Sequence, residues 1–287
     1  MIDIHNYKIT ITLPFENRIG LKAPATALME NIIELHHFIF FFILLISGLV
    51  MWLLVQIIDN FIYLYNFKLK IINNKVFGHL DHFLSYSLVA KLYNKRLFKE
   101  NKFLEAAWTL FPGIILIIIS IPSFFMLYLA EESIETLLTI KAVGFQWYWT
   151  YDYTDLFPFW YNLKTPGKLD IDDYIIESYM DPLEYLDLSK GEFRLLEADD
   201  ILVLPINIHL RLIITSMDTL HSFGLPSLGL KVDAIPGRLN KVDIYINRMG
   251  VFYGQCSEIC GIGHGFMPIS LHAVSYLNFL IGDLFCG

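Results

Sequence analysis

The sequence predicts a membrane-anchored all-β protein, in which a hairpin of two transmembrane helices is followed by a β-sandwich or barrel. Three observations predict this class: two long uncharged apolar runs, a series of short alternating segments after residue 139, and an uneven distribution of charge. Hydrophobic residues make up 55% of the 287 positions and charged residues 17%, against about 45–50% and 25% in an average soluble domain. This composition excludes a disordered chain and a nucleic-acid binder with a basic face.

The two apolar runs cover residues 38–58 and 106–130, and neither contains a charged side chain. The shorter run, 21 residues at 1.5 Å each, forms a helix of about 31 Å, which matches the thickness of a hydrocarbon core. Core helices of a soluble protein are the alternative, but two such runs need a very large core. We therefore expect two transmembrane helices, at 38–58 and 106–130.

The charge of the connecting segments predicts their sides of the membrane. Residues 1–37 carry a net charge of −1, residues 59–105 carry +4 and residues 131–287 carry −11. Because basic loops stay on the inner side, 59–105 is predicted to be an extended inner-side loop. The N-terminal segment 1–37 and the domain 131–287 then lie on the outer side.

The outer domain shows strand patterns from its start. Phe145, Trp147 and Trp149 alternate in an aromatic stretch, and further strand-like segments cover 193–196, 201–204, 208–215, 242–246, 251–254 and 267–274. Several short strands with turn signals between them are typical of a sandwich or barrel. Residues 156–191 contain proline, glycine and seven acids, so we expect a long loop there, with an acidic insertion near 156–177.

A candidate metal site lies in the string Cys256-Ser-Glu-Ile-Cys260-Gly-Ile-Gly-His264-Gly-Phe-Met267. One cysteine followed by histidine and methionine resembles the ligand loop of a blue-copper site, where thiolate, imidazole and a weak thioether meet copper. Such a site needs a second histidine. His221 is predicted to lie in a separate turn 35 residues before Cys256, and a folded sandwich can bring the two together.

The additional Cys256 has no place in a site for one copper ion. Two thiolates can instead bridge two copper ions, each of which takes one imidazole, with Met267 and the Glu258 carbonyl as weak ligands. A disulfide, or a structural zinc site of two cysteines and two histidines, is the alternative for these residues. Zinc has no use for the methionine, and a disulfide has no use for the histidines.

Further strings carry a family resemblance. They are Met29-Glu30-Asn31, Glu105-Ala-Ala-Trp108-Thr109, Gly144-Phe-Gln146-Trp147-Tyr148-Trp149, His221-Ser222, Pro226-Ser-Leu-Gly-Leu, Asp233-Ala-Ile-Pro-Gly-Arg238-Leu-Asn240 and Tyr253-Gly-Gln-Cys256-Ser-Glu258-Ile-Cys260-Gly. Through these strings the chain closely resembles subunit II of the haem–copper cytochrome c oxidases, mitochondrial type. The resemblance covers most of the chain.

The resemblance implies a fold and a set of site residues. The fold is a two-helix hairpin carrying a cupredoxin-like Greek-key β-sandwich. The resemblance places a dinuclear copper A centre on His221, Cys256, Glu258 (by its carbonyl), Cys260, His264 and Met267. It implies that the Glu258 carboxylate binds Mg²⁺ shared with subunit I, that electrons enter at Trp147, and that Glu105 stands at a proton-channel mouth. Without the resemblance, Trp147 is interpreted as a core residue and Glu105 as an interfacial acid.

The implied function is electron transfer within a respiratory oxidase. The subunit accepts electrons from reduced cytochrome c and passes them to the haem centres of subunit I, where O₂ is reduced to water with proton pumping. It is an enzyme only as part of that complex, in a lipid bilayer with other oxidase subunits and without nucleic acid. A membrane-anchored copper carrier or assembly protein, and a quinol-oxidase subunit, are the alternatives. The implied location is the mitochondrial inner membrane, with the C-terminal domain in the intermembrane space and a bacterial plasma membrane as the second option.

Overall fold

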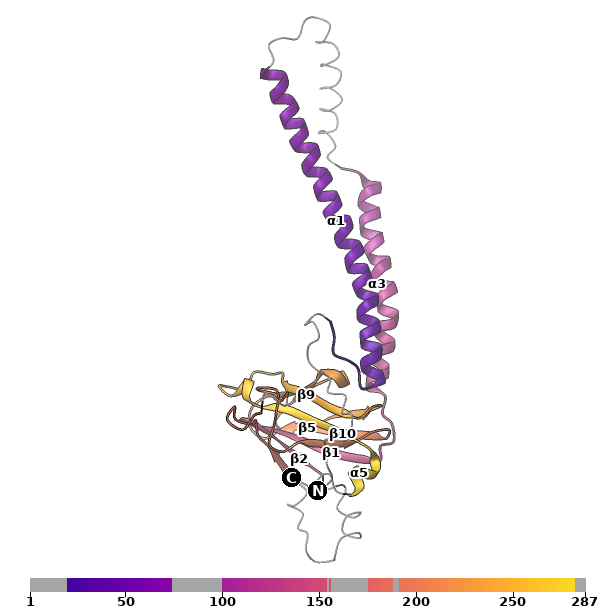
Figure 1. Cartoon of the computed structure of the whole chain (residues 1–287). Helices are drawn as coiled ribbons and strands as arrows, with labels where there is room; N and C mark the ends of the chain where they lie inside the picture. Colours follow the sequence, from indigo (N-terminus) through magenta and orange to yellow (C-terminus); the bar gives the residue numbers. More distant parts are fainter. Residues whose placement is uncertain (1–19, 74–99, 154, 156–174, 188–190, 282–287) are drawn as a thin grey trace, which may run out of the picture. The chain divides into compact units, whose positions relative to one another are not determined.

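The computed structural model describes residues 20–73, 100–153, 155, 175–187 and 191–281 (Figure 1). The chain divides into two compact units, Leu35–Phe125 on one hand and Met1–Glu34 with Met126–Gly287 on the other. The expectations for residues 1–19, for 74–99 and for 156–174 fall outside the described residues.

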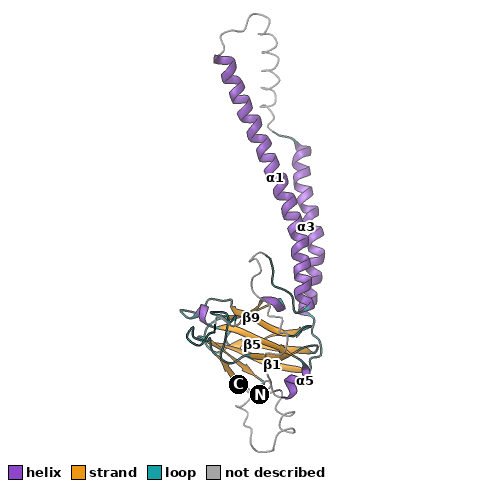
Figure 2. Cartoon of the chain, viewed as in Figure 1, coloured by secondary structure: helices purple, strands orange, loops and turns teal. Residues whose placement is uncertain are grey.

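Two long helices, α1 (Ala27–Asn73) and α3 (Lys102–Glu131), contain the two apolar runs (Figure 2). Both are long and apolar enough to cross a membrane, with mean hydropathies of 2.9 over Ala27–Asp59 and 2.4 over Lys102–Glu131. The helix α1 begins within the predicted outer-side segment and continues into the predicted inner-side loop. The uncharged run therefore marks only the apolar part of a longer helix.

Each helix begins at a side-chain cap. Asn101 Oδ1 accepts hydrogen bonds from the backbone N–H groups of Phe103 (3.0 Å) and Leu104 (3.1 Å) at the start of α3. Thr26 Oγ1 accepts the N–H of Met29 (3.1 Å) before α1 and donates to the carbonyl of Leu228 (2.8 Å). Such caps satisfy N–H groups that have no partner within the helix.

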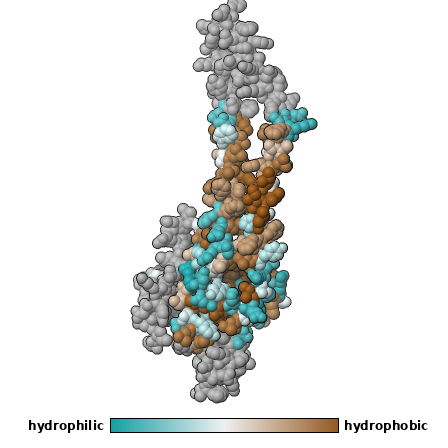
Figure 3. All heavy atoms as spheres, turned by 90° about the vertical axis from the view of Figure 1, so that its right-hand side faces the viewer, coloured by the Kyte–Doolittle hydropathy of each residue, from teal (hydrophilic) through white to brown (hydrophobic). Residues whose placement is uncertain are grey.

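The helix surfaces are apolar where they are exposed. Trp52 is 58% exposed on α1, and Phe103 and Tyr128 are 84% and 73% exposed on α3. Figure 3 shows apolar side chains over much of the visible helix surface. A soluble protein rarely leaves so large an apolar area in water, so these surfaces fit the interior of a lipid bilayer.

The rest of the described chain is a β-domain. Its strands are β1 (Leu138–Phe145), β2 (Tyr148–Asp152), β3 (Ile175–Ser178), β4 (Leu202–Pro205), β5 (His209–Ser216), β6 (His221–Leu225), β7 (Leu230–Ala234), β8 (Asn240–Tyr245), β9 (Gly250–Cys256) and β10 (Pro268–Val274). Short 3₁₀ helices, η5 (Pro226–Leu228) and η6 (His264–Phe266), and the helix α5 (Tyr276–Ile281) complete it.

The strands form two five-stranded sheets, with the orders β3-β2-β1-β5-β8 and β4-β10-β9-β6-β7. The pairs β1–β5 and β4–β10 are parallel, and the other pairs are antiparallel. Side chains from both sheets fill one core that includes Trp149, Tyr151, Phe223 and Phe252. The predicted β-sandwich is therefore confirmed.

Five of the predicted strand segments match β4, β5, β8, β9 and β10. The segment 193–196 was predicted wrongly, because its residues form turns in which the N–H groups of Leu196 and Glu197 donate to the carbonyl of Phe193. The expected loop over 156–191 was wrong at β3, whose residues pair with β2. No strand was predicted at β6 or β7, and β6 is buried throughout and shows no alternation. His221 was predicted wrongly to lie in a turn, because it is the first residue of β6.

Trp147 does not continue a strand. β1 ends at Phe145 and β2 begins at Tyr148, so Gln146 and Trp147 form the turn between them, and Trp147 is half-buried. The alternation of Phe145, Trp147 and Trp149 therefore spans a hairpin turn.

Candidate metal centre

The connection from β9 to β10 carries most of the candidate ligands. Cys256 is the last residue of β9, and Met267 directly precedes β10. The side chains of Cys256, Cys260 and Met267 are all buried, whereas His264, the first residue of η6, is half-buried. The two antiparallel strands thus fix both ends of a loop whose sulfur atoms point into the domain.

His221 reaches this loop from the neighbouring strand. It is the first residue of β6, which pairs with β9 through Phe223 and Cys256. Its imidazole is fully buried, and its Nδ1 lies 4.0 Å from Sγ of Cys256. A Cβ placed on Gly144 of β1 would lie 2.9–3.1 Å from the carbons of this side chain, so the glycine leaves room for it.

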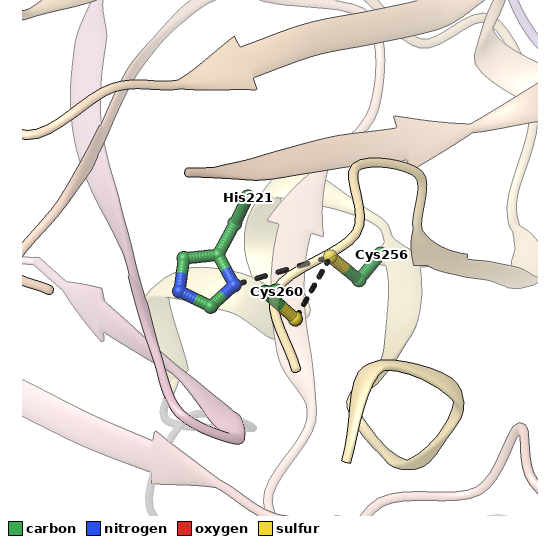
Figure 4. A group of neighbouring side chains, drawn as sticks. All are labelled: His221, Cys256 and Cys260. Atoms are coloured by element: carbon green, nitrogen blue, oxygen red, sulfur yellow. Dashed lines mark hydrogen bonds between the residues drawn. The ribbon is translucent and has the colours of Figure 1, made fainter. Parts of the chain in front are cut away.

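The two cysteines and His221 converge on one point (Figure 4). Sγ of Cys256 lies 4.0 Å from Sγ of Cys260, and one possible ligand atom from each of the three side chains lies within 4.8 Å of the others. Both thiols are free, and their separation is about twice the 2.05 Å of a disulfide bond. Metal–thiolate bonds of about 2.3 Å allow both sulfurs to bind the same metal ion.

The remaining predicted ligands surround the same sulfur atoms. Nδ1 of His264 lies 3.7 Å from Sγ of Cys260, and Sδ of Met267 lies 3.6 Å from it. The carbonyl oxygen of Glu258 lies 3.3 Å from Sγ of Cys256. Two thiolates, two imidazoles, a thioether and a carbonyl therefore lie around one small volume, and this donor set fits the soft preference of copper.

The thiols of Cys256 and Cys260 differ in their pKa. Burial raises the pKa of Cys256, but hydrogen bonds with His221 and with the backbone of Ser222 and Glu258 outweigh it and lower the pKa to about 6. Burial, and then the negative charge of Cys256, raise the pKa of Cys260 to about 12. The protein thus forms one thiolate readily, and a cation between the sulfurs would favour the second.

Trp147 and its neighbour contact the ligand loop directly. Nε1 of Trp147 and Nε2 of Gln146 both donate to the carbonyl of Cys260, at 3.3 Å and 2.8 Å. A Cβ placed on Gly263 would overlap the ring of Trp147, so the indole packs against bare backbone. Trp147 therefore borders the candidate site from the hairpin turn.

The carboxylates of Glu105 and Glu258, unlike the candidate copper ligands, lie apart from the sulfur atoms. Glu105 lies exposed in the first turn of α3, in the other compact unit. Glu258 is half-buried in the ligand loop, and within the described part of the chain its carboxylate belongs to no group of possible metal ligands. The structure brings neither carboxylate into the sulfur cluster.

Sequence reasoning missed two polar residues at the site, Gln146 and Asp218. Oδ1 of Asp218 lies 2.7 Å from Nε2 of His221, and its other oxygen accepts the backbone N–H of Gln146 at 2.7 Å. Partial burial raises the pKa of Asp218, but these bonds and that from the Thr219 N–H lower it overall. Gln146 directly precedes Trp147, and Asp218 precedes His221 by three residues. These positions were the signals in the sequence that could have found them.

Comparison with known proteins finds similarity over nearly the whole chain. The family model "Cytochrome C oxidase subunit II, periplasmic domain" matches residues 138–274, and "Cytochrome C oxidase subunit II, transmembrane domain" matches 14–79 and 67–126. Cytochrome c oxidase subunit 2 of Cyanidium caldarium is 42% identical over 275 residues, which cover 96% of this chain and 93% of the relative. The Arabidopsis thaliana protein is 44% identical over 259 residues, with coverage of 90% and 85%.

Among solved structures, one similar chain is the periplasmic domain of subunit II of cytochrome oxidase from Bradyrhizobium japonicum. It is 39% identical, with a TM-score of 0.41, and the match covers 52% of this chain and 91% of that one.

Proposed function

The chain belongs to the cytochrome c oxidase subunit II family, and on that premise we propose that its β9–β10 loop holds a dinuclear copper A centre. The proposed ligands are His221, Cys256, Glu258 through its carbonyl, Cys260, His264 and Met267. As a family member the chain is a subunit of a respiratory oxidase and is not catalytic alone. It accepts electrons from reduced cytochrome c and passes them to the haem centres of subunit I, which reduces O₂ to water with proton pumping.

The observation that carries this proposal is the cluster of two free sulfurs 4.0 Å apart, with an imidazole nitrogen close to each. A disulfide does not fit this separation. A zinc site leaves Met267 unused, although its sulfur lies 3.6 Å from Cys260. A site for one copper ion leaves one thiolate unused, whereas a site for two copper ions would use every donor.

The protein holds these metal-ligating atoms in fixed positions. The ligand side chains start from β6, from the end of β9 and from the loop that connects β9 to β10, and they are buried, apart from His264. When bound, the copper centre supplies a carrier that takes up and releases one electron at a time. A preformed and water-excluding donor set keeps bond lengths nearly constant between the two oxidation states, so little reorganisation accompanies transfer.

Trp147 is the proposed site of electron input. Its ring is half-buried beside the ligand loop, and its N–H donates to the carbonyl of Cys260. The domain's net charge of −11 favours docking of a basic carrier such as cytochrome c on the outer side. These features favour electron transfer over the second candidate, a copper carrier, which needs an open and exchangeable site.

Two further roles rest on family membership. We assign the carboxylate of Glu258 to a Mg²⁺ ion shared with subunit I, and Glu105 to the mouth of a proton channel. Glu258 is half-buried within the ligand loop, and Glu105 is exposed at the start of α3. The proposed location is the mitochondrial inner membrane, with the β-domain in the intermembrane space. A bacterial plasma membrane is the second option.

The decisive experiment is an electron paramagnetic resonance spectrum of the purified oxidase, combined with copper analysis of the subunit. We expect two copper ions in the β-domain and a hyperfine pattern from one electron shared equally by two copper nuclei. A cystine, bound zinc, or the pattern of a single cupric ion at these cysteines would reject the proposal. A quinol-oxidase subunit would show no copper there.

A further inference from the structure

The geometry points to Gln146 as the positioning residue that fixes Trp147 against the ligand loop and thereby sets the rate of electron input. This inference deepens the proposed function and depends on it. Gln146 occupies the turn between β1 and β2, directly before Trp147, and its side chain is exposed. An exposed amide buries little apolar area, so its contribution must come from its hydrogen bonds.

The side chain of Gln146 makes the stronger of two bonds to one acceptor. Its Nε2 donates to the carbonyl oxygen of Cys260 at 2.8 Å, whereas Nε1 of Trp147 donates to the same oxygen at 3.3 Å. Backbone and amide N–H groups usually bond at 2.9–3.0 Å, so the indole bond is long for its type. The amide of Gln146 therefore holds the Cys260 carbonyl at the turn, and the position of the Trp147 indole depends on that carbonyl.

The backbone of Gln146 is fixed from the opposite side. Its N–H donates to Oδ2 of Asp218 at 2.7 Å, and Oδ1 of the same carboxylate lies 2.7 Å from Nε2 of His221. A continuous chain of hydrogen bonds thus runs from His221 through Asp218 and Gln146 to Cys260. Gln146 is the member of this chain that joins the two ligand-bearing segments.

The loop is shaped to accept this contact. A Cβ on Gly261 would lie 3.0 Å from the Trp147 ring and 3.4 Å from Nε2 of Gln146, and a Cβ on Gly263 would overlap the ring. The indole and the amide therefore lie side by side on the same backbone. Without the amide bond, nothing else in the described structure holds the Cys260 carbonyl at this turn except the long indole bond.

The affected step is the transfer of one electron from the reduced carrier to the centre, with no bond formed or broken. Electron transfer slows as the distance between donor and acceptor grows, so we expect electron input to be several-fold slower without the amide bond. Gln146 touches neither metal nor substrate in this scheme, so copper binding should not change.

The test uses the assembled oxidase with Gln146→Ala and Gln146→Glu, the second of which keeps the length but presents only acceptors when ionised. The control is Gln255→Ala, which truncates another exposed glutamine beside Cys256. Rapid mixing or flash reduction with cytochrome c measures the rate of electron input. Steady-state turnover separates kcat from KM. Copper analysis measures the copper content, and the paramagnetic spectrum measures the hyperfine pattern. We expect slower input and lower kcat in both Gln146 variants, with copper content and hyperfine pattern as in the control. KM should equal that of the control in Gln146→Ala, which leaves the charge unchanged.

Unchanged input rates in both variants would overturn the inference. Copper loss or an altered hyperfine pattern would also overturn it, because Gln146 would then support the ligands themselves. A raised KM with unchanged kcat would show direct docking of the carrier on Gln146 instead. An unaltered oxidase that lacks the shared-electron pattern would reject the proposed function, an outcome visible before any variant is made.

Discussion

Oδ1 of Asp218 lies 2.7 Å from Nε2 of His221, while Nδ1 of the same ring faces Sγ of Cys256 at 4.0 Å. A carboxylate on one ring nitrogen favours a proton there and leaves the other nitrogen free to bind a metal. Asp218 lies in the turn between β5, which ends at Ser216, and β6, which begins at His221 three residues later, and this turn brings the two side chains together. Asp218 thereby orients the only candidate ligand that lies outside the β9–β10 loop.

The first prediction concerns the charge of Asp218. Asp218→Asn keeps an acceptor for His221 but removes the negative charge, so the oxidised, more positive centre loses stabilisation. A charged hydrogen bond exceeds a neutral one by about 1 kcal/mol, which corresponds to a rise of roughly 40 mV in a one-electron reduction potential. Redox titration of the oxidase measures this shift. Asp233→Asn removes the same charge from an exposed position on β7 and should leave the potential unchanged.

A second prediction tests the bridging role of the sulfurs. Cys256→Ser or Cys260→Ser should abolish the dinuclear site and lower the copper content from about two ions to one or none. Met267→Leu should keep both ions and shift the potential, because a thioether is a weak ligand. Copper analysis and the paramagnetic spectrum measure both. Cys286→Ser, outside the described residues, is the control, and two copper ions in Cys256→Ser would contradict the bridging role.

Much of the fold was predictable because its patterns are local. Two uncharged runs that match the thickness of a bilayer predict the helices without tertiary information. Strands such as β5, with its alternating burial, follow from period-two alternation. β6 was not predictable this way, since it is buried along its whole length and contains serine and glycine. The turn at Gln146 and Trp147 was missed because aromatic alternation passes through it.

In the candidate site, too, the local patterns were predictable and the contacts between distant residues were not. Cys256, Cys260, His264 and Met267 share one short loop, so their spacing is visible in the sequence. His221 was paired with them on chemical grounds, and the β6–β9 pairing brings it within 4.0 Å of Cys256. The role of Gln146 depends on two hydrogen bonds to residues more than 70 positions away, and no sequence pattern reports such contacts.

The net charge of −11 over residues 131–287 predicts salt-dependent docking. Raising the ionic strength from 0.01 M to 0.15 M shortens the Debye length from about 30 Å to about 8 Å, which screens attraction between separated charges. We expect the second-order rate of reaction with cytochrome c to fall about tenfold or more over this range. Stopped-flow measurements at both ionic strengths test it. A rate that does not change with salt would contradict docking by the acidic domain.

The pair of Arg211 and Asp243 predicts a pH dependence of stability. Nε of Arg211 donates to Oδ1 of Asp243 at 2.7 Å and Nη2 donates to Oδ2 at 2.9 Å, which joins β5 to β8. The hydrogen bond from Arg211 holds the pKa of Asp243 below its usual value. Because the folded pKa lies below the unfolded value of about 3.9, the stabilisation is present above that pH and is lost as the pH falls through the folded pKa.

Asp243→Asn should therefore lower the thermal midpoint of the β-domain near pH 7, and the difference from the unaltered chain should shrink below about pH 4. Thermal unfolding of the detergent-solubilised chain at the two pH values measures this. Asp233→Asn, on an exposed side chain without such a partner among the hydrogen bonds described, is the control. A difference that stays constant with pH would contradict the assignment of the stabilisation to the ionised carboxylate.

The last prediction compares two glycines of the ligand loop. A Cβ on Gly263 would overlap the Trp147 ring, whereas a Cβ on Gly265 would meet nothing within 4 Å. Neither glycine has the positive backbone angle that favours glycine, so the two alanine variants differ mainly in this contact. Overpacking typically costs about 1–3 kcal/mol, and we expect Gly263→Ala to lower the stability of the β-domain by that amount.

Gly263→Ala should also slow electron input from cytochrome c, because the ring must move away from the Cys260 carbonyl to which its N–H donates. Gly265→Ala should change neither stability nor input rate. Unfolding in denaturant and flash-induced electron transfer measure the two effects separately. If Gly263→Ala lowered stability while electron input kept its rate, the close contact would serve only packing, and the position of Trp147 would not limit the transfer.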